Sequence, residues 1–251
     1  MIYIMDLDGT LIDSTKRHYV LMEKIIRHEI ARGQLSPTVA KMFDAHEFMA
    51  FKAGGNSGKS YLTEKLLLSG EDAAGIMKAW GEEIESEEML ALDRLYPDTL
   101  SCLKRIANSG NIIIFLTARQ REDLVRKQLQ DLQILSYAKE LFVVDPAHGA
   151  EEKCRVVRGI LEKVKQEDYV DDIVPRENAE RKGFEKENRA IESPEIKNPE
   201  KNIIIVGDTE NEWQLANELH LPCYLLSRGF RSKAFWDKKG CIAMEDLCRL
   251  P

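Results

Sequence analysis

Two aspartates separated by one residue follow a short apolar stretch near the beginning of the sequence. Residues 1–5 are apolar, Asp6 and Asp8 come directly after them, and Gly9 follows. An apolar run of this length, closed by glycine, is typical of a buried strand in a parallel sheet. Ligands of such sheets bind at the carboxyl ends of the strands. Paired carboxylates at that edge can hold a divalent cation, and they can divide nucleophilic attack and proton transfer between them.

Polar side chains also end two later apolar runs. Residues 112–116 give the strongest strand signal in the chain and stop at Thr117, and residues 202–207 stop at Asp208. The carboxyl ends of parallel strands lie at one edge of a sheet. We therefore expect Asp6, Asp8, Thr117 and Asp208 at a common edge, which is more specific than any one motif.

The predicted elements divide the chain into a strand-containing region and an all-helical region. Apolar runs without alternation, separated by helical patterns, predict an α/β fold with a Rossmann-like parallel sheet and helices on both faces. The strands are expected at 1–5, 112–116, 141–144, 202–207 and 223–226, and the helices between them at 98–110, 121–132, 151–164 and 210–219. Asp98 or a neighbour is the expected cap of the first of these helices.

Only helical signals occur between the first strand and about residue 95. They cover residues 14–32, 39–51, 61–68 and 72–92. We therefore predict a discontinuous core at 1–14 and 95–251, with an all-helical domain at 15–94 inserted after the first strand. Residues 165–201 within the core are about half charged, with few large apolar side chains. This composition fits a mobile surface insertion or, alternatively, an arm that docks a partner.

Composition excludes several classes of protein. The 251 residues are 43% hydrophobic and 31% charged, with a net charge of −7, which argues against a nucleic-acid or anionic-membrane partner. No apolar run approaches the roughly 20 residues that span a bilayer, and no basic leader precedes one. The five cysteines are scattered and form no Cys-x-x-Cys pair. We expect a cytoplasmic protein with reduced thiols, without a zinc site or a disulfide framework.

The stretch Asp6-x-Asp8-Gly9-Thr10-Leu11 resembles the first motif of the haloacid dehalogenase superfamily, most of whose members are phosphatases. The threonine and the acidic cluster at the later strand ends resemble its second and fourth motifs. The resemblance covers the whole chain, and the helical insertion looks like the cap domain of that superfamily. Residues 96–98 and 116–119 are similar to its phosphoglycolate-phosphatase-like branch.

The resemblance implies a role for each matching residue. Asp6 would be the nucleophile that forms an aspartyl phosphate, and Asp8 would be the general acid and then the base for the attacking water. Thr117 would bind the phosphoryl oxygens, together with the backbone amides of Ala118 and Arg119 at a helix start. The Arg119 side chain either reaches the substrate or lies at the surface.

The resemblance also implies a lysine and a metal ion at the site. Lys153 matches the cation that meets the phosphate, with Lys139 as the alternative. Mg²⁺ would be bound by Asp6, Asp208 and the backbone carbonyl of Asp8. The family usually has aspartate where Glu212 stands, and the longer side chain of Glu212 could still hold a metal-bound water.

A glycine-rich loop at residues 53–60 has three interpretations. It fits a permissive P-loop pattern, but a P-loop follows a buried strand, and the residues before this loop have a helical pattern. As a cap loop, it would bring Gly55, Asn56 and Lys59 to the substrate and set selectivity. It could also be a plain connection between helices.

Together these features predict a Mg²⁺-dependent phosphatase that hydrolyses a small phosphorylated metabolite. The alternatives are a phosphomutase on the same scaffold, a nucleotide-binding kinase that uses residues 53–60, and a binding protein without catalytic activity. Neither the substrate nor the oligomeric state follows from the sequence.

Overall fold

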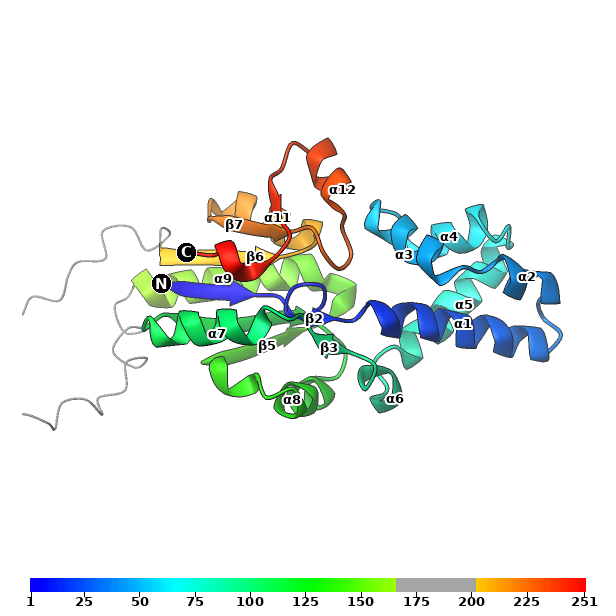
Figure 1. The fold of residues 1–251 in the computed structure, drawn as a ribbon, viewed down its shortest axis with the longest axis horizontal. Helices are drawn as coiled ribbons and strands as arrows, with labels where there is room; N and C mark the ends of the chain where they lie inside the picture. The colour runs from blue at the N-terminus through cyan, green and yellow to red at the C-terminus, as the bar shows by residue number, and fades with distance from the viewer. Residues whose placement is uncertain (166–201) are drawn as a thin grey trace, which may run out of the picture.

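A six-stranded parallel sheet forms the centre of the core in the computed structural model, which describes residues 1–165 and 202–251. Its strand order is β5-β4-β1-β6-β7-β8, so the first strand lies in the middle (Figure 1). The strands are β1 (Ile2–Met5), β4 (Ile112–Ala118), β5 (Glu140–Val144), β6 (Ile203–Gly207), β7 (Cys223–Leu226) and β8 (Ala243–Met244). The parallel sheet was predicted, whereas β8 was not. The predicted insertion at 165–201 lies outside the described residues, apart from Lys165.

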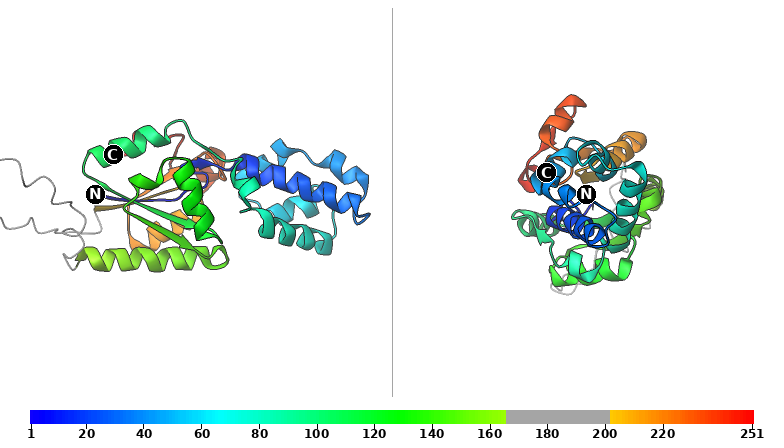
Figure 2. Two further views of the ribbon diagram at one scale, coloured as in Figure 1. Left: turned by 90° about the horizontal axis from the view of Figure 1, so that it is seen from below. Right: turned by 90° about the vertical axis from the view of Figure 1, so that its right-hand side faces the viewer.

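Both faces of the sheet are covered by helices, because alternate side chains of each strand point to opposite sides. Tyr3 and Met5 pack in one buried cluster, with α7 (Thr99–Asn108) and α8 (Glu122–Asp131). Ile2 and Ile4 pack in the other, with α9 (Gly149–Lys165) and α11 (Glu210–Leu219). Figure 2 shows α7 and α9 on opposite sides of the sheet. Apolar residues at consecutive positions of β1 therefore reflect burial on both faces.

The inserted helices pack around a hydrophobic cluster of their own, beyond the carboxyl end of β1 (Figure 1). They are α1 (Thr15–Ala31), α2 (Pro37–Met42), α3 (Ala45–Ala53), α4 (Gly58–Glu64), α5 (Gly70–Glu83) and α6 (Glu87–Leu90). Two longer predicted helices, at 39–51 and 72–92, are each divided. Asp44 and Ser86 have extended backbones and accept hydrogen bonds from the next helix, so each caps a new helix instead of continuing the old one.

A two-stranded antiparallel sheet joins the core to the cap. It consists of β2 (Ile12–Asp13) and β3 (Arg94–Leu95), where the chain enters and leaves the helical insertion. The sequence predicted only helices up to residue 95, so this part of the prediction was wrong. Strands of two residues carry no detectable pattern, and their pairing joins positions about 80 residues apart.

The remaining short elements complete the core. They are α12 (Lys233–Lys238) and the 3₁₀ turns η1 (Leu135–Tyr137), η2 (Pro146–His148) and η5 (Leu247–Arg249). Within the described part of the chain, no helix has the length and apolar character needed to span a membrane.

Candidate active site

The register of the sheet brings the polar strand ends together. Met5 at the end of β1 pairs with Phe115 of β4 on one side and with Val206 of β6 on the other. Thr117 lies two residues after Phe115, and Asp208 lies two residues after Val206. The Asp6 amide donates to the Val206 carbonyl at 3.0 Å. The three chain segments therefore end at the same edge, next to the cap.

Lys153 lies between two carboxylates. Its Nζ is 2.8 Å from Asp6 Oδ1 and 2.6 Å from Glu212 Oε1, and all three side chains are buried. Burial raises the pKa of Asp6 to about 7, although Lys153 opposes the shift and Glu212 adds to it. Burial would lower the pKa of Lys153, but Asp6 and Glu212 outweigh it and raise the pKa. Lys153 is thus held as a cation against Asp6, the predicted nucleophile. Lys139, the alternative, precedes β5 and is therefore not at the carboxyl end of that strand.

Both oxygens of Glu212 have partners within the protein. Oε1 accepts from Lys153, and Oε2 accepts from the hydroxyl of Thr209 at 2.6 Å and from its amide at 3.3 Å, which forms a capping box at the start of α11. A Cβ on Gly207 would lie 2.2 Å from the Glu212 side chain, so only glycine fits there. In this arrangement Glu212 positions Lys153 and caps α11.

Asp8 is bound by two arginines. Arg119 donates to both of its oxygens, at 2.7 and 2.8 Å, and Arg17 from α1 of the cap donates at 2.6 Å. Burial would raise the pKa of Asp8, but Arg119 and Arg17 outweigh it and lower the pKa to about 2. Arg17 also pairs with Asp93, at 3.2 Å, in the segment that returns from the cap. Asp8 is therefore ionised and linked to the cap.

Asp208 is a buried carboxylate without a cationic partner among the described residues. Within residues 1–165 and 202–251, its hydrogen-bond donors are the Phe230 amide at 2.8 Å and the Thr10 hydroxyl at 3.4 Å. Burial raises its pKa well above the ordinary value, and the charge of Asp6 adds to the shift. A Cβ on Gly9 would lie 2.1 Å from the Asp208 carboxylate, so Gly9, with φ +75°, lets the loop that follows β1 approach Asp208.

These surroundings fit a divalent cation. Asp6 and Asp208 are two buried carboxylates, the charge of Asp6 raises the pKa of Asp208, and among the described residues only Asp6 has a lysine paired with it. Hard cations such as Mg²⁺ are bound by one or two carboxylates together with backbone carbonyls, water and phosphate oxygens. The Asp8 carboxylate faces the arginines, which leaves its backbone carbonyl as the group that could join the set.

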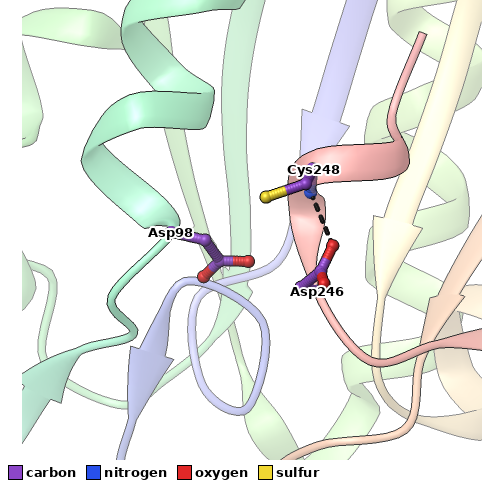
Figure 3. A group of neighbouring side chains, drawn as sticks. All are labelled: Asp98, Asp246 and Cys248. Atoms are coloured by element: carbon purple, nitrogen blue, oxygen red, sulfur yellow. Dashed lines mark hydrogen bonds between the residues drawn. The ribbon is translucent and has the colours of Figure 1, made fainter.

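A second acidic group contains none of the site residues described above. Asp98, Asp246 and Cys248 bring possible ligand atoms within 4.8 Å of one another (Figure 3). Asp98, however, accepts from Arg228 with both oxygens and from the Leu247 amide, and Asp246 accepts from the Cys248 amide. This group therefore joins the C-terminal segment to α7, and Asp98 makes these contacts instead of the predicted side-chain cap of α7.

The predicted phosphate-binding segment is in place, but one expectation for it was wrong. Thr117 and Ala118 are the last residues of β4, and α8 begins only at Glu122. The Arg119 amide donates to the Val144 carbonyl at 3.0 Å, so it is not a free donor at a helix start. The Arg119 side chain is 3% exposed, which excludes the surface alternative, and its Nη1 is buried without a partner among the described residues.

The glycine-rich loop contacts the core with its backbone. Gly55, with φ +92°, lies so close to Phe235 that a Cβ would be 2.4 Å from the ring. Asn56 is exposed and donates to the Phe51 carbonyl, and Lys59 is exposed in α4. The loop follows helix α3 and not a strand, so it lacks the context of a P-loop.

Three residues at the cap side were missed by the sequence reasoning. Arg17 binds Asp8, and Lys52 and His18 lie next to each other, with 2.8 Å between Nζ and Nδ1. The sequence did contain a signal for Arg17 and His18. Both lie at the start of α1, the first helix after Asp6 and Asp8, where side chains can face the strand ends. Lys52 had no such signal, because its position depends on how α3 packs.

A family model for haloacid dehalogenase-like hydrolases matches residues 1–219. The chain belongs to this family. The resemblance inferred from the strand-end motifs is thus confirmed, and so is the α/β fold with its helical cap. A comparison with curated protein sequences found no match.

Solved structures of low sequence identity share the fold of this haloacid dehalogenase-like hydrolase. A haloacid dehalogenase-like family protein from Streptococcus pneumoniae has 17% identity and a TM-score of 0.61, covering 96% of this chain and 91% of its own. A predicted phosphatase from Clostridium acetobutylicum has 14% identity and a TM-score of 0.58, with coverages of 96% and 91%. A predicted phosphoglycolate phosphatase from Haemophilus somnus has 15% identity and a TM-score of 0.52, with coverages of 92% and 86%.

Proposed function

We propose that this hydrolase is a Mg²⁺-dependent phosphatase that cleaves a small phosphomonoester through an aspartyl phosphate on Asp6. The observation that carries the proposal is the arrangement of Asp6 between a lysine and a second buried carboxylate without a cation, Asp208. Phosphoryl groups carry heavy negative charge, so a carboxylate attacks them only where cations neutralise that charge. Similarity in fold to predicted phosphatases agrees with this proposal.

Asp6 attacks phosphorus in the first step, and the bond to the leaving oxygen breaks. The buried cation Lys153 lies against Asp6 and offsets the charge of the phosphoryl group. The unpartnered Nη1 of Arg119 and the Thr117 hydroxyl at the end of β4 supply further donors for the phosphoryl oxygens. The Ala118 amide belongs to the same phosphate-binding segment.

Asp8 transfers the protons in both steps. In the arrangement seen here its lowered pKa keeps Asp8 ionised, so its carboxylate can accept a proton from the water that hydrolyses the aspartyl phosphate. Its earlier role as an acid requires a proton on Asp8. We infer that a bound phosphoryl group attracts Arg17 and Arg119, which weakens their hold on Asp8 and raises its pKa.

Mg²⁺ would be held by Asp6, Asp208 and the Asp8 backbone carbonyl. When bound, it would supply charge neutralisation at the phosphoryl oxygens. The proposed domain bounds are a core at 1–14 and 95–251 and a cap at 15–94, with the cap covering the site. The substrate is a small phosphorylated metabolite that fits between them.

The proposal is tested by measuring phosphate release from p-nitrophenyl phosphate and from a panel of phosphorylated metabolites, with Mg²⁺ and with EDTA. We expect activity only with Mg²⁺, and a loss of more than about 10³-fold in Asp6→Asn, because an amide cannot form the acyl phosphate. A folded Asp6→Asn protein that retained substantial activity would contradict the mechanism. Isomerisation of a sugar phosphate without phosphate release would indicate a phosphomutase, and no turnover of any substrate would favour a binding protein.

A further inference from the structure

Lys52 lies at the end of α3 in the cap, and its side chain is partly buried. Among the described residues, no carboxylate forms an ion pair with its ammonium group. Its polar neighbour is His18 Nδ1, at 2.8 Å. The other neighbours are aromatic: Nζ lies 4.9 Å from the ring centre of Phe230 and 5.6 Å from those of Phe48 and Trp80.

These contacts place Lys52 at the candidate active site. The Phe230 ring lies under the ammonium group, and the Phe230 amide binds Asp208. The His18 ring contacts the same Phe230 ring at a tilt of 54°, with 4.5 Å between ring centres, and its chain neighbour Arg17 binds Asp8. Lys52 therefore lies on the cap side of the site, across from the strand ends.

The position of Lys52 is held by the backbone of α3. The carbonyl of Lys52 accepts from Arg231 at 3.2 Å, and the carbonyl of Ala53 accepts from the Ser232 amide at 2.9 Å. Both donors belong to the loop that also carries Phe230. Since this loop contacts both Asp208 and the end of α3, the ammonium group is positioned relative to the core and not merely to the cap.

An ammonium group in such surroundings is destabilised unless an anion pairs with it. Removing a charge from water is costly unless it is paired. Burial lowers the pKa of Lys52 to about 7, and the charges of Arg231 and Arg17 add to the shift, while Asp8 and Asp208 oppose it. Burial and the nearby Lys52 likewise lower the pKa of His18, so its neutral ring accepts from Lys52 and leaves the charge available.

We propose that Lys52, oriented by His18, binds an anionic group on the leaving portion of the substrate. The inference rests on the proposed phosphatase function and narrows its substrate class to phosphomonoesters that carry a second anion, a carboxylate or another phosphate. The core residues bind the phosphoryl group that is transferred, and Lys52 binds the distal anion. This assigns selectivity to Lys52 in the cap and not to the exposed Lys59.

Matched pairs of substrates test this inference. One pair is 3-phosphoglycerate and glycerol 3-phosphate, which differ by a carboxylate in place of a hydroxymethyl group. The other is propane-1,3-diol bisphosphate and 3-hydroxypropyl phosphate. The enzyme should prefer the charged member of at least one pair, and the pair that shows the preference identifies the anion.

The decisive variant is Lys52→Met, which keeps the length of the side chain and removes its charge. We expect kcat/KM for the preferred charged substrate to fall about 10- to 100-fold, since hydrogen bonds between charged groups are worth this much. The neutral partner and p-nitrophenyl phosphate should lose far less. Lys78→Met, at an exposed lysine of α5, is the matched control and should change none of these values.

Equal losses on charged and neutral substrates in Lys52→Met would overturn the inference, because they would indicate a structural role. So would a wild-type enzyme that prefers neither charged substrate. A wild-type enzyme that fails to hydrolyse even p-nitrophenyl phosphate would instead contradict the proposed function, so the two failures are distinguishable.

Discussion

At the scale of single residues, each carboxylate of the site has a different electrostatic environment. In the part of the chain that the structure describes, Asp6 pairs with one lysine, Asp8 pairs with two arginines, and Asp208 accepts from uncharged donors only. The pKa values separate accordingly, to about 7 for Asp6 and about 2 for Asp8. Neighbouring acids with different pKa values can take different roles in one reaction, and the roles that we propose here are nucleophile, proton carrier and metal ligand.

The raised pKa of Asp6 predicts a pH-dependent effect of Asp6→Asn on stability. The folded-state pKa of about 7 lies above the ordinary value of 3.8, so the folded protein binds this proton more tightly than the unfolded chain. The stabilisation from protonated Asp6 is complete below the ordinary value and is lost as the pH rises to about 7. Asparagine stays neutral, so the melting temperature of the variant relative to wild type should rise across this window.

The measurement is a series of melting temperatures in EDTA for both proteins between pH 4 and 8. Saturating Mg²⁺ should reduce the difference in melting temperature between Asp6→Asn and wild type, because a bound cation would stabilise ionised Asp6 in the wild type. A difference that stays constant with pH in EDTA would show that Asp6 titrates normally in the folded protein.

At the scale of elements, the cap is bound to the core through a few specific contacts. Arg17 of α1 joins Asp8 to Asp93, and the end of α3 contacts the loop around Arg231. In a third contact, the Glu85 carboxylate of the cap accepts from the amides of Gln120 and Arg121, just before α8, at 2.9 to 3.0 Å. The segment between β4 and α8 is thus attached to the cap through the Glu85 side chain.

Removal of the Glu85 contacts should weaken this attachment. We expect Glu85→Ala to lower the free energy of unfolding by about 1–2 kcal/mol, because hydrogen bonds from two backbone amides to a charged acceptor are lost. Urea denaturation measures the change. The matched control is Glu87→Ala, whose carboxylate pairs with exposed Lys127 and should contribute much less. If the two variants were equally stable, the amide contacts of Glu85 would have no net effect.

At the scale of the whole molecule, the site exists only when the sheet is assembled. Asp6, Thr117 and Asp208 come from three adjacent strands, and Lys153 comes from α9, which covers one face of the sheet. A ligand that binds this set binds the folded protein and not the unfolded chain. Its binding free energy therefore adds to the stability of the fold.

Mg²⁺ should raise the melting temperature of the wild-type protein by several degrees, because a 100-fold excess over Kd contributes ~2.7 kcal/mol. Asp208→Asn should remove most of this shift. Asp246→Asn, in the second acidic group, should retain it and serves as the matched control. A shift that depended on Asp246 and not on Asp208 would move the cation site to the group shown in Figure 3.

The local sequence was sufficient for the fold class and for the residues at the strand ends. Apolar runs closed by Asp6, Thr117 and Asp208 predict buried parallel strands whose ends meet, because buried strands and strand-end sites leave contiguous patterns. Lys153 was proposed from the family resemblance, because it lies near the start of the helix predicted after the third strand. The turns that divide the cap helices at Asp44 and Ser86 were missed, since a capping residue within an apolar pattern looks like part of a longer helix.

Only the tertiary structure decided which charges meet. Glu212 contacts Lys153 across 59 positions of sequence, and Arg119 binds Asp8 across 111. Lys52 and His18 become neighbours only when α3 packs on α1, and the cap contributes them to the site when it docks on the core loop at Phe230. Side-chain pairing depends on packing between elements, and the periodicity of a sequence records burial within an element but not its partner.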